Sequence, residues 1–577
     1  MNVEETKQAM IALIESNASI KWDKRDSNLA EELRQAETAS DVAVLLVACF
    51  DRLENYFGEE FLSIVKNSLS PDIWNALGVF VNPKYIPDCG YDMHYVLSDG
   101  TVKTVQDHNV SVSYYGDVDL TVKEGAAFVQ DTKNRVKVED NGFVVARGHT
   151  QVYATGHSSV DLQGHARGIV QDDVIVQTFG QSFVESIGGR PDITAYDQSR
   201  FLISEGSAKI EMFNFSRGML ISADNHRDPI KVLTGGEGLL YVGPGNPGGV
   251  LIKKKNADCV ILDGQKQHIT PEEIRDVIIP EYGNQKLRIG DSIQTSLDAE
   301  RIKMDLSPYL PAWNQDWEKD MFAWASNEKE IAVAIKSYIP DMVQKGMTGE
   351  FLRSHFTEKT LHANRIFMNV ADQEQLSSLL FDTELSPCYF FGDQLVNDRL
   401  CNAPVYGFEH TLVISSKSAE INASANAIVV GDGQLKANGT GKVFALNNAN
   451  VEASNQVKLY LEGASKGVTN GSVYVKAYGE SQLFGHGHTN AELYDRCMMV
   501  ANDDSRVLAL GDNELIMMGK TEVAFPNYET GHQANITIKS NETTLKGLDR
   551  PEQVGRYKAS MVNDQSSTLI RSTGLGR

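Results

Sequence analysis

An eight-residue repeat constrains this chain more than any other feature of its sequence. Cut into eights from Ser418 to Glu529, the chain gives fourteen octads in one register, such as KLYLEGAS, YVKAYGES and RVLALGDN. The second position is apolar in thirteen octads and the sixth is Gly, Asn or Asp in thirteen, with Gly467 and Ala423 as the exceptions. These three residue types make up about a fifth of ordinary sequence, so chance does not produce such a column.

The same pattern occurs earlier in the chain. From Ser111 to Arg190 it forms ten octads, and the second position is apolar in nine of them. Pro191 then shifts the phase by one residue, after which the octads DITAYDQS and RFLISEGS resume it. Proline cannot donate a hydrogen bond to a β-ladder, so this slip indicates a bulge or a corner.

The alternation within each octad predicts β-strands with one buried face, because successive side chains of a strand point to opposite sides. The Gly/Asn/Asp column supplies a position that tolerates left-handed backbone where each coil turns. We therefore predict a β-solenoid of two octad-repeat arrays, combined with α-helical cap or head regions. Eight residues are too few to close a coil, and the sequence leaves open two or three octads per coil, the handedness and the placement of the two arrays.

The regions outside the octads read mainly as helices. All five tryptophans lie there, which predicts that the bulky cores belong to the helical parts. The expected organisation is a helical head at 1–80, connecting or cap strands at 81–110, a first array at 111–250, a mixed, mainly helical insert or second head at 251–400, a second array at 401–530 and a polar C-terminal tail at 531–577.

Two short matches link the helical regions. DVAV at 41–44 matches EIAV at 330–333, and GEEFL at 58–62 matches GEFL at 349–352. One gap reconciles their offsets, which favours a duplicated module of helical head plus solenoid; chance matching of helix-forming residues is the alternative. Helical caps would also cover the open strand edges that a solenoid exposes at its ends.

The octad pattern x-V-x-A-x-G-x-S, as in YVKAYGES, resembles the short-period β-solenoids of gut bacteria and of their phages and mobile elements. The resemblance covers the two arrays. It implies the fold and says little about activity, because a fold does not determine a function.

Composition and charge exclude several classes of protein. With a net charge of −23, the chain repels nucleic-acid phosphates and anionic membranes, so we expect no nucleic-acid partner. No stretch approaches the ~20 apolar residues of a membrane helix, so we expect no membrane insertion. The start resembles no signal peptide, and six scattered cysteines without a CxxC pair predict reduced thiols. We expect a cytoplasmic protein, with signal-less export or a place in a virion as alternatives.

Three histidines are the first candidate site. His149, His157 and His165 occupy the seventh position of successive octads. With two octads per coil, His149 would stack over His165, and a histidine ladder could hold a metal or respond to pH. No cysteine or carboxylate completes a ligand shell at neighbouring positions, so we interpret the three as turn residues and expect neither a metal nor a cofactor.

Further motifs are better explained as turns. Gly243–Gly249 followed by Lys253–Lys255 lacks the G-x-x-x-x-G-K-[ST] spacing of a phosphate-binding loop. Asp172–Asp173 and Asp503–Asp504 each occupy a single turn, without a cluster of carboxylates around them. Because no catalytic motif accompanies the octads, we expect that the protein is not an enzyme.

An outward row of aromatic residues is expected on the second array: Tyr460, Tyr478 and Tyr494, with Phe444 and Phe484. We interpret the three tyrosines as a partner-binding face; cross-strand stacking that stabilises the coils is the alternative. The leading hypothesis is a non-catalytic interaction or assembly protein whose rigid faces and helical heads bind protein partners, further copies of itself included. It would be a structural protein of a phage or mobile element, or would bind and neutralise a toxin.

Two other functions stay open at this point. A carbohydrate-active enzyme on a β-helix requires a groove with clustered acids and bases, which the octads do not show. An acidic DNA mimic requires a charge density near that of DNA, about one phosphate per 1.7 Å. Residues 111–207 and residues 418–529 each carry 13 acidic and 8 basic side chains, a net charge of only −5 per array.

Overall fold

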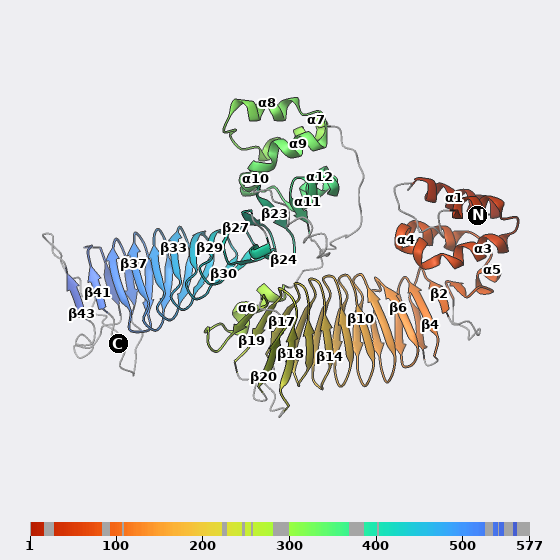
Figure 1. Cartoon of the computed structure of the whole chain (residues 1–577), viewed down its shortest axis with the longest axis horizontal. Coiled ribbons are helices and arrows are strands. Elements are labelled where there is room, and N and C mark those ends of the chain that lie inside the picture. Colours follow the sequence, from red (N-terminus) through yellow and green to blue (C-terminus); the bar gives the residue numbers. More distant parts are fainter. Residues whose placement is uncertain are drawn as a thin grey trace, which may run out of the picture. The chain divides into compact units, whose positions relative to one another are not determined.

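The computed structural model describes residues 2–16, 28–83, 93–106, 109–221, 228–244, 249–255, 258–280, 299–368, 386–400, 403–524, 535–540, 542–546 and 558–561. The chain divides into two compact units, Met1–Gly236 with Gly245–Cys259, and Glu237–Pro244 with Val260–Arg577. Parallel β-strands in four sheets form most of the structure, accompanied by helices (Figure 1). This arrangement is compatible with a β-solenoid. Among the described helices, none has the length and apolar character needed to cross a membrane.

The helices form two groups. The first group is α1 (Val3–Ser16), α2 (Leu29–Gln35), α3 (Ala39–Ala48), α4 (Phe50–Asn67) and α5 (Pro71–Asn75). The second group is α7 (Ala299–Leu306), α8 (Asp316–Trp324), α9 (Glu328–Ile335), α10 (Ile339–Gln344), α11 (Gly349–His355) and α12 (Glu358–Ala363). Helix α6 (Pro271–Ile278) precedes this group in the chain and contributes none of the described residues of its core. Short 3-10 turns lie at Ser307–Tyr309, Lys336–Tyr338 and Asp398–Leu400.

The strands that follow the first helices belong to two sheets, A and B, each ordered as in the chain. Sheet A contains β1 (Val79–Val81), β2 (Met93–Leu97), β4 (Ser111–Tyr115), β6 (Ala126–Gln130), β8 (Phe143–Arg147), β10 (Ser159–Leu162), β12 (Ile175–Thr178), β14 (Asp192–Ala195), β16 (Lys209–Met212), β18 (Ile230–Thr234) and β20 (Val250–Lys254). Sheet B contains β3 (Val102–Gln106), β5 (Val118–Val122), β7 (Arg135–Val138), β9 (Gln151–Ala154), β11 (Arg167–Val170), β13 (Phe183–Ile187), β15 (Arg200–Glu205), β17 (Arg217–Leu220), β19 (Leu239–Val242) and β21 (Val260–Asp263).

The later strands form sheets C and D, which are ordered in the same way. Sheet C contains β22 (Ile366–Met368), β23 (Cys388–Phe391), β25 (Val405–Gly407), β27 (Ser418–Ala423), β29 (Gln434–Gly439), β31 (Asn450–Asn455), β33 (Lys466–Asn470), β35 (Gln482–Gly485), β37 (Met498–Asn502), β39 (Glu514–Met518), β41 (Asn535–Ile538) and β43 (Lys558–Met561). Sheet D contains β24 (Leu395–Asn397), β26 (Leu412–Ser415), β28 (Asn426–Val429), β30 (Lys442–Ala445), β32 (Lys458–Leu461), β34 (Tyr474–Ala477), β36 (Asn490–Leu493), β38 (Arg506–Ala509), β40 (Glu522–Ala524) and β42 (Thr544–Lys546).

Strand register is constant over long stretches of both stacks. Ser159 pairs with Ile175 in sheet A, and Lys442 pairs with Lys458 in sheet D, so paired residues lie sixteen positions apart. From β2 and from β23 onward, successive strands alternate between the two sheets of a stack, and each strand pairs with the next but one. Over these stretches the chain therefore returns to the same sheet after sixteen residues, the length of two octads.

The register changes where the sequence phase slips. Ile175 pairs with Asp192, one position further along than in the preceding coils. The pairing of β13 with β15 also shifts between Ser186 and Ile187. Pro191 lies between β13 and β14, outside the paired residues, so the parallel ladder continues beyond it.

Left-handed backbone marks the turns. In the first stack Gly156 and Asp172 have φ of 74° and 72°, and in the second Gly479 and Asp495 have φ of 71° and 49°. All four occupy the sixth position of their octads. In both stacks the aspartate accepts a hydrogen bond from the backbone N–H of the glycine one coil earlier, at 3.2 Å and 2.9 Å. The Gly/Asn/Asp column therefore forms the turn and links one coil to the next.

The side chains between the two sheets of each stack are mainly apolar. In β10, Val160 and Leu162 are fully buried, while the intervening positions are partly exposed. In β34, Val475 and Ala477 repeat this pattern. Strand alternation therefore places the second and fourth octad positions in the core, as their apolar character predicts.

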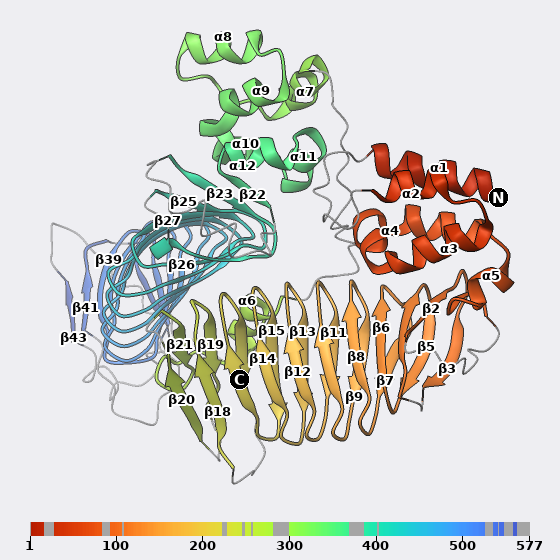
Figure 2. The ribbon, with the colours of Figure 1, turned by 45° about the vertical axis from the view of Figure 1, so that its right-hand side comes forward.

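The first helical group packs on the first strands of sheet A. Phe50 of α4 stacks on Tyr95 of β2, with ring centroids 4.1 Å apart. Both rings belong to one apolar cluster that also includes Trp74 of α5 and Val79 of β1. Figure 2 shows α1 to α5 beside this end of the stack. Glu54 of α4 is buried, and this burial raises the pKa of its carboxyl group. The positive charge of Arg147 acts to lower the same pKa.

The second helical group has its own core, which it shares with the first strands of sheet C. Tyr389 and Phe391 of β23 belong to it, together with buried residues of α7 to α12. Trp74 and Trp313 pack in the two helical cores as expected, whereas the two tryptophans of α8 do not. Trp74 is buried, but Trp317 and Trp324 of α8 are 61% and 79% exposed. Trp22 lies outside the described residues.

The matched sequences have matching environments. DVAV lies at the start of α3 and EIAV at the start of α9. In both, the acidic residue is exposed and the next two residues are buried. The fourth residue points to solvent in both cases, Val44 being 49% exposed and Val333 55% exposed.

The passage from helices to strands is also alike. Gly78 before β1 and Arg365 before β22 both have left-handed backbone, with φ of 77° and 61°. The carbonyl of Gly78 accepts from the N–H of Tyr95 at 2.8 Å, and that of Arg365 accepts from the N–H of Tyr389 at 2.9 Å. The same local geometry thus follows both helical groups.

Gly189 provides a test of the tight turns. Its φ is 80°, and a Cβ added to it would lie 2.3 Å from Cα of Asp172. We expect Gly189→Ala to destabilise the protein by about 1–3 kcal/mol, because it adds both backbone strain and a clash with main-chain atoms. Thermal unfolding measures the change. Gly100→Ala is the matched control, since no atom lies within 4 Å of the added Cβ, and it should leave the melting temperature nearly unchanged.

Glu54 provides a pH test. Because burial raises its folded-state pKa, ionised Glu54 disfavours the folded state at neutral pH. We expect Glu54→Gln to raise the melting temperature at neutral pH, and this gain should disappear as the pH falls through the raised pKa toward about 4. The exposed Glu60→Gln on the same helix is the control and should show no such pH-dependent gain. A constant difference at every pH would contradict the assignment.

Candidate partner-binding face

The outer face of sheet D is partly apolar. Register aligns Ile428, Phe444, Tyr460, Lys476 and Glu492 on successive strands from β28 to β36. The first three are buried although they point away from the core between the sheets, and Tyr460 is only 8% exposed. Another part of the unit therefore covers this end of the face.

Helix α6 lies on this face. Nζ of Lys442 in β30 lies 2.6 Å from the carboxylate of Asp276. It also donates a hydrogen bond to the backbone carbonyl of Glu273 at 2.8 Å. Lys476 of β34 pairs with the carboxylate of Glu273 at 2.6 Å. These contacts place two basic residues of the sheet under two acidic residues of the helix.

The sequence of α6 explains why a helix forms there. Thr270 and Glu273 form a capping box, and Pro271 follows at the first helical position. Its three buried residues are apolar: Ile274, Val277 and Ile278. The helix is therefore amphipathic, with a buried apolar side and acidic residues beside it.

An aromatic stack continues the contact. The ring of His268, in the turn before α6, lies 5.0 Å from that of Tyr478, which in turn stacks on Tyr494 at 4.4 Å. Nδ1 of His268 lies 3.5 Å from a carboxylate oxygen of Glu462. Burial raises the pKa of Glu462, while His268 acts to lower it. The hydroxyl of Tyr494 donates to Glu492 at 2.9 Å.

The structure thus distributes the predicted aromatic row over different positions. Tyr460 and Phe444 lie on the outer face of sheet D and are buried, whereas Tyr478 and Tyr494 follow its strands and are half-buried. Phe484 belongs to β35 in sheet C. The tyrosine stack exists, and a helix of the same unit occupies part of the face predicted to bind a partner. Partner binding by these tyrosines stays a prediction.

The sequence predicts a mainly helical region at 251–400 but does not indicate where α6 lies. The residues of the contact, His268 and Glu273 on one side and Lys442 and Lys476 on the other, are separated by more than 150 positions. No repeat or motif links them. The available signal was the amphipathic character of α6, which requires an apolar surface but does not specify which one.

The histidines separate into a pair and a single residue. His149 and His165 precede strands of sheet B, and their rings stack 5.2 Å apart. His157 precedes β10 of sheet A, and its Nε2 lies 3.9 Å from Asp173. Among the described residues, no group of three His, Cys, Asp or Glu side chains could hold a metal ion. Metal binding therefore gains no geometric support.

The acidic pairs have structural partners. Asp172 accepts from Gly156, as described above, and Asp503 accepts from the backbone N–H of Gly487 at 3.1 Å. His488 lies 3.8 Å from Asp504, which repeats the arrangement of His157 and Asp173. Asp172 and Asp503 therefore stabilise the turns by hydrogen bonds, and Asp173 and Asp504 lie beside histidines of neighbouring turns.

Neither the lysine run at Lys253–Lys255 nor the buried cysteines form a reactive site among the described residues. Lys253 and Lys254 are exposed on β20, and residues 245–248 of the glycine-rich segment lie outside the described residues. Cys259 and Cys497 are buried, which raises the pKa of their thiols to about 11 and about 12. Thiols with such pKa values are poor nucleophiles at neutral pH.

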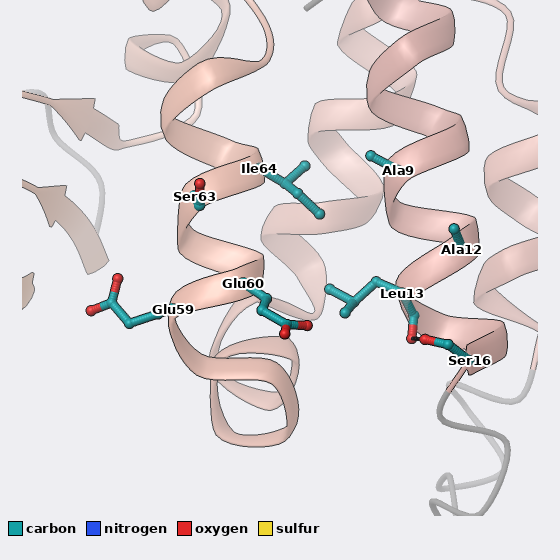
Figure 3. Close-up of a pocket in the computed structure, with 8 residues that line it drawn as sticks. All are labelled: Ala9, Ala12, Leu13, Ser16, Glu59, Glu60, Ser63 and Ile64. Atoms are coloured by element: carbon teal, nitrogen blue, oxygen red, sulfur yellow. Dashed lines mark hydrogen bonds between the residues drawn. The ribbon is translucent and has the colours of Figure 1, made fainter. Parts of the chain in front are cut away.

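A hollow lies between α1 and α4 in the first helical group (Figure 3). Leu13 and Ile64 point into the space between the two helices. The residues that line it are Ala9, Ala12, Leu13, Ser16, Glu59, Glu60, Ser63 and Ile64. Their mixture of small, apolar and acidic side chains brings together no set of groups for acid–base or nucleophilic chemistry.

Comparisons with protein-family models, with curated proteins and with solved structures found no match for this chain. Its functional interpretation therefore rests on the geometry above.

The α6 contact can be tested by hydrogen exchange. We expect Lys442→Ala/Lys476→Ala to accelerate amide exchange in residues 271–279 roughly tenfold or more, because hydrogen bonds to charged groups contribute about 1.5–3 kcal/mol each. Mass spectrometry of the matching peptide measures the change. The control Lys458→Ala/Lys466→Ala replaces two exposed lysines of the same stack and should leave this peptide unaffected. Equal exchange in both variants would contradict the contact.

Proposed function

We propose that this protein is a non-catalytic interaction or assembly protein. Its two arrays would be β-solenoids with two octads per coil, each preceded by a helical cap, and the pair would result from one duplication. Partners would be proteins, with self-assembly as one form of the same activity. A structural role in a phage or mobile element, or the binding of a toxin, would suit such a protein.

The observation that carries this proposal is the docking of α6 on sheet D. Two lysines of the sheet pair with Glu273 and Asp276 of the helix, and the outward side chains Phe444 and Tyr460 are buried beside them. The outer face of a parallel stack in this chain thus already binds a helix. Regular strand register provides such faces along the whole stack, and rigid repetitive surfaces of this kind suit protein recognition.

The helical groups support the architectural part of the proposal. Each is followed by a left-handed residue, a short parallel strand and a tyrosine in the next strand, Tyr95 or Tyr389. Each also packs apolar residues on its first strands. Helices at these positions would protect strand ends from pairing with other chains.

Affinity purification from a lysate of the native host, combined with light scattering of the pure chain, tests the function. We expect either a stoichiometric protein partner that survives moderate salt or a regular oligomer, because apolar docking persists when surface charges are screened. Partner identity follows from mass spectrometry. A monomer that recovers no partner at low or moderate salt would contradict the proposal and would direct attention to glycan binding.

A further inference from the structure

Helix α8 in the second helical group has an exposed tryptophan stripe, which we define as Trp317, Met321 and Trp324. Their spacing of four and three residues places them on one side of the helix. Trp317 and Trp324 are 61% and 79% exposed, and Met321 is half-buried. Tryptophan is the side chain most enriched at energetically important positions of protein interfaces, so two exposed on one nine-residue helix indicate a docking surface.

The stripe is held by contacts on other sides of the helix. Phe322 of α8 is buried in the core of the helical group. The hydroxyl of Tyr338 donates to Glu318, and it also accepts from the backbone N–H of Asn314 at 3.0 Å. At the other end, Nζ of Lys303 in α7 donates to the carbonyl of Ala323 at 2.8 Å. The two tryptophans therefore project from a helix that is fixed at both ends.

Acidic side chains border the stripe. Asp316 and Asp320 are exposed, and Asp320 lies three positions after Trp317 and four before Trp324, which places it next to both. Glu318 lies on the opposite flank of the stripe. A surface of this composition attracts basic groups and repels anionic lipid headgroups.

Helix α6 provides the internal precedent for what such a helix binds. Its apolar residues are buried, and its acidic residues Glu273 and Asp276 pair with Lys476 and Lys442 of a sheet that also carries apolar side chains. Helix α8 has the same ingredients, an apolar side with acidic neighbours, but its two tryptophans are exposed. The complement of α8 would then resemble the outer face of sheet D, with lysines set among apolar residues.

We propose that the tryptophan stripe of α8 docks a partner protein through a cationic amphipathic segment. Apolar side chains of that segment cover Trp317 and Trp324, while its lysines or arginines meet Asp316 and Asp320. This inference rests on the proposed interaction function and names the chemistry of one partner. The stripe belongs to the second helical group: in the described part of the first group, the exposed large apolar residues are Val44 and Tyr56.

A defined probe tests this inference on the full chain. We would titrate the protein with a labelled, helical leucine–lysine peptide and measure fluorescence anisotropy, using a leucine–glutamate peptide and vesicles of zwitterionic or anionic lipid for comparison. Trp317→Ala/Trp324→Ala should weaken binding of the lysine peptide at least tenfold, because buried tryptophans dominate interface energies. Asp316→Asn/Asp320→Asn should weaken it less and should reduce its salt dependence.

The control variant is Val44→Ser/Ile175→Ser, which removes two exposed apolar side chains elsewhere and should bind like the unaltered protein. Circular dichroism confirms that each variant is folded. Equal affinity of the tryptophan variant, equal binding of the glutamate peptide, or vesicle binding that depends on these tryptophans would overturn the inference. If the tryptophan variant still recovers a partner from host lysate, the interaction function stands and only the docking site is wrong; if the unaltered protein recovers none and stays monomeric, the proposed function itself fails.

Discussion

The in-register parallel ladder is the constraint on which the rest of this structure depends. Each strand pairs with strands one coil before and one coil after it, so a coil can change length only where the ladder tolerates an extra residue. The turns must therefore repeat the same left-handed geometry, which glycine, asparagine and aspartate adopt most readily. Across Pro191 the spacing grows from sixteen to seventeen, and the ladder continues because Pro191 lies between β13 and β14, outside the paired positions.

This ladder also decides where the helices pack. Strand alternation sends every second side chain outward, and most outward side chains are partly exposed. Two of the aromatic ones, Tyr95 and Phe444, are buried by helices: α4 stacks on Tyr95, and α6 is paired with lysines beside Phe444. Exposed aromatic rows on sheets are costly and prone to aggregation, so such rows indicate positions that another element covers.

Periodicity accounts for what the sequence could predict. The parallel strands, the inward apolar positions and the left-handed turns follow from the octads, because each depends on residues within a few positions of one another. The contact of Glu273 with Lys476 could not be predicted in this way, since the two residues are 203 positions apart and belong to no repeat. The exposure of Trp317 and Trp324 could not be predicted either: a helical pattern shows which residues share a side, and the packing of α7 to α12 determines which side is buried.

Helices α6 and α8 have similar sequence features at their starts but pack against different parts of the unit. Both begin with a capping box and carry acidic residues in the first turn. In α6 the capping-box glutamate, Glu273, also binds a lysine of sheet D, so one side chain starts the helix and attaches it. In α8 the corresponding Glu318 accepts from Tyr338 within the same helical group, and this contact leaves the tryptophan side facing outward. Glu273 thus attaches α6 to sheet D, whereas Glu318 attaches α8 to its own helical group and leaves its tryptophans available to a partner.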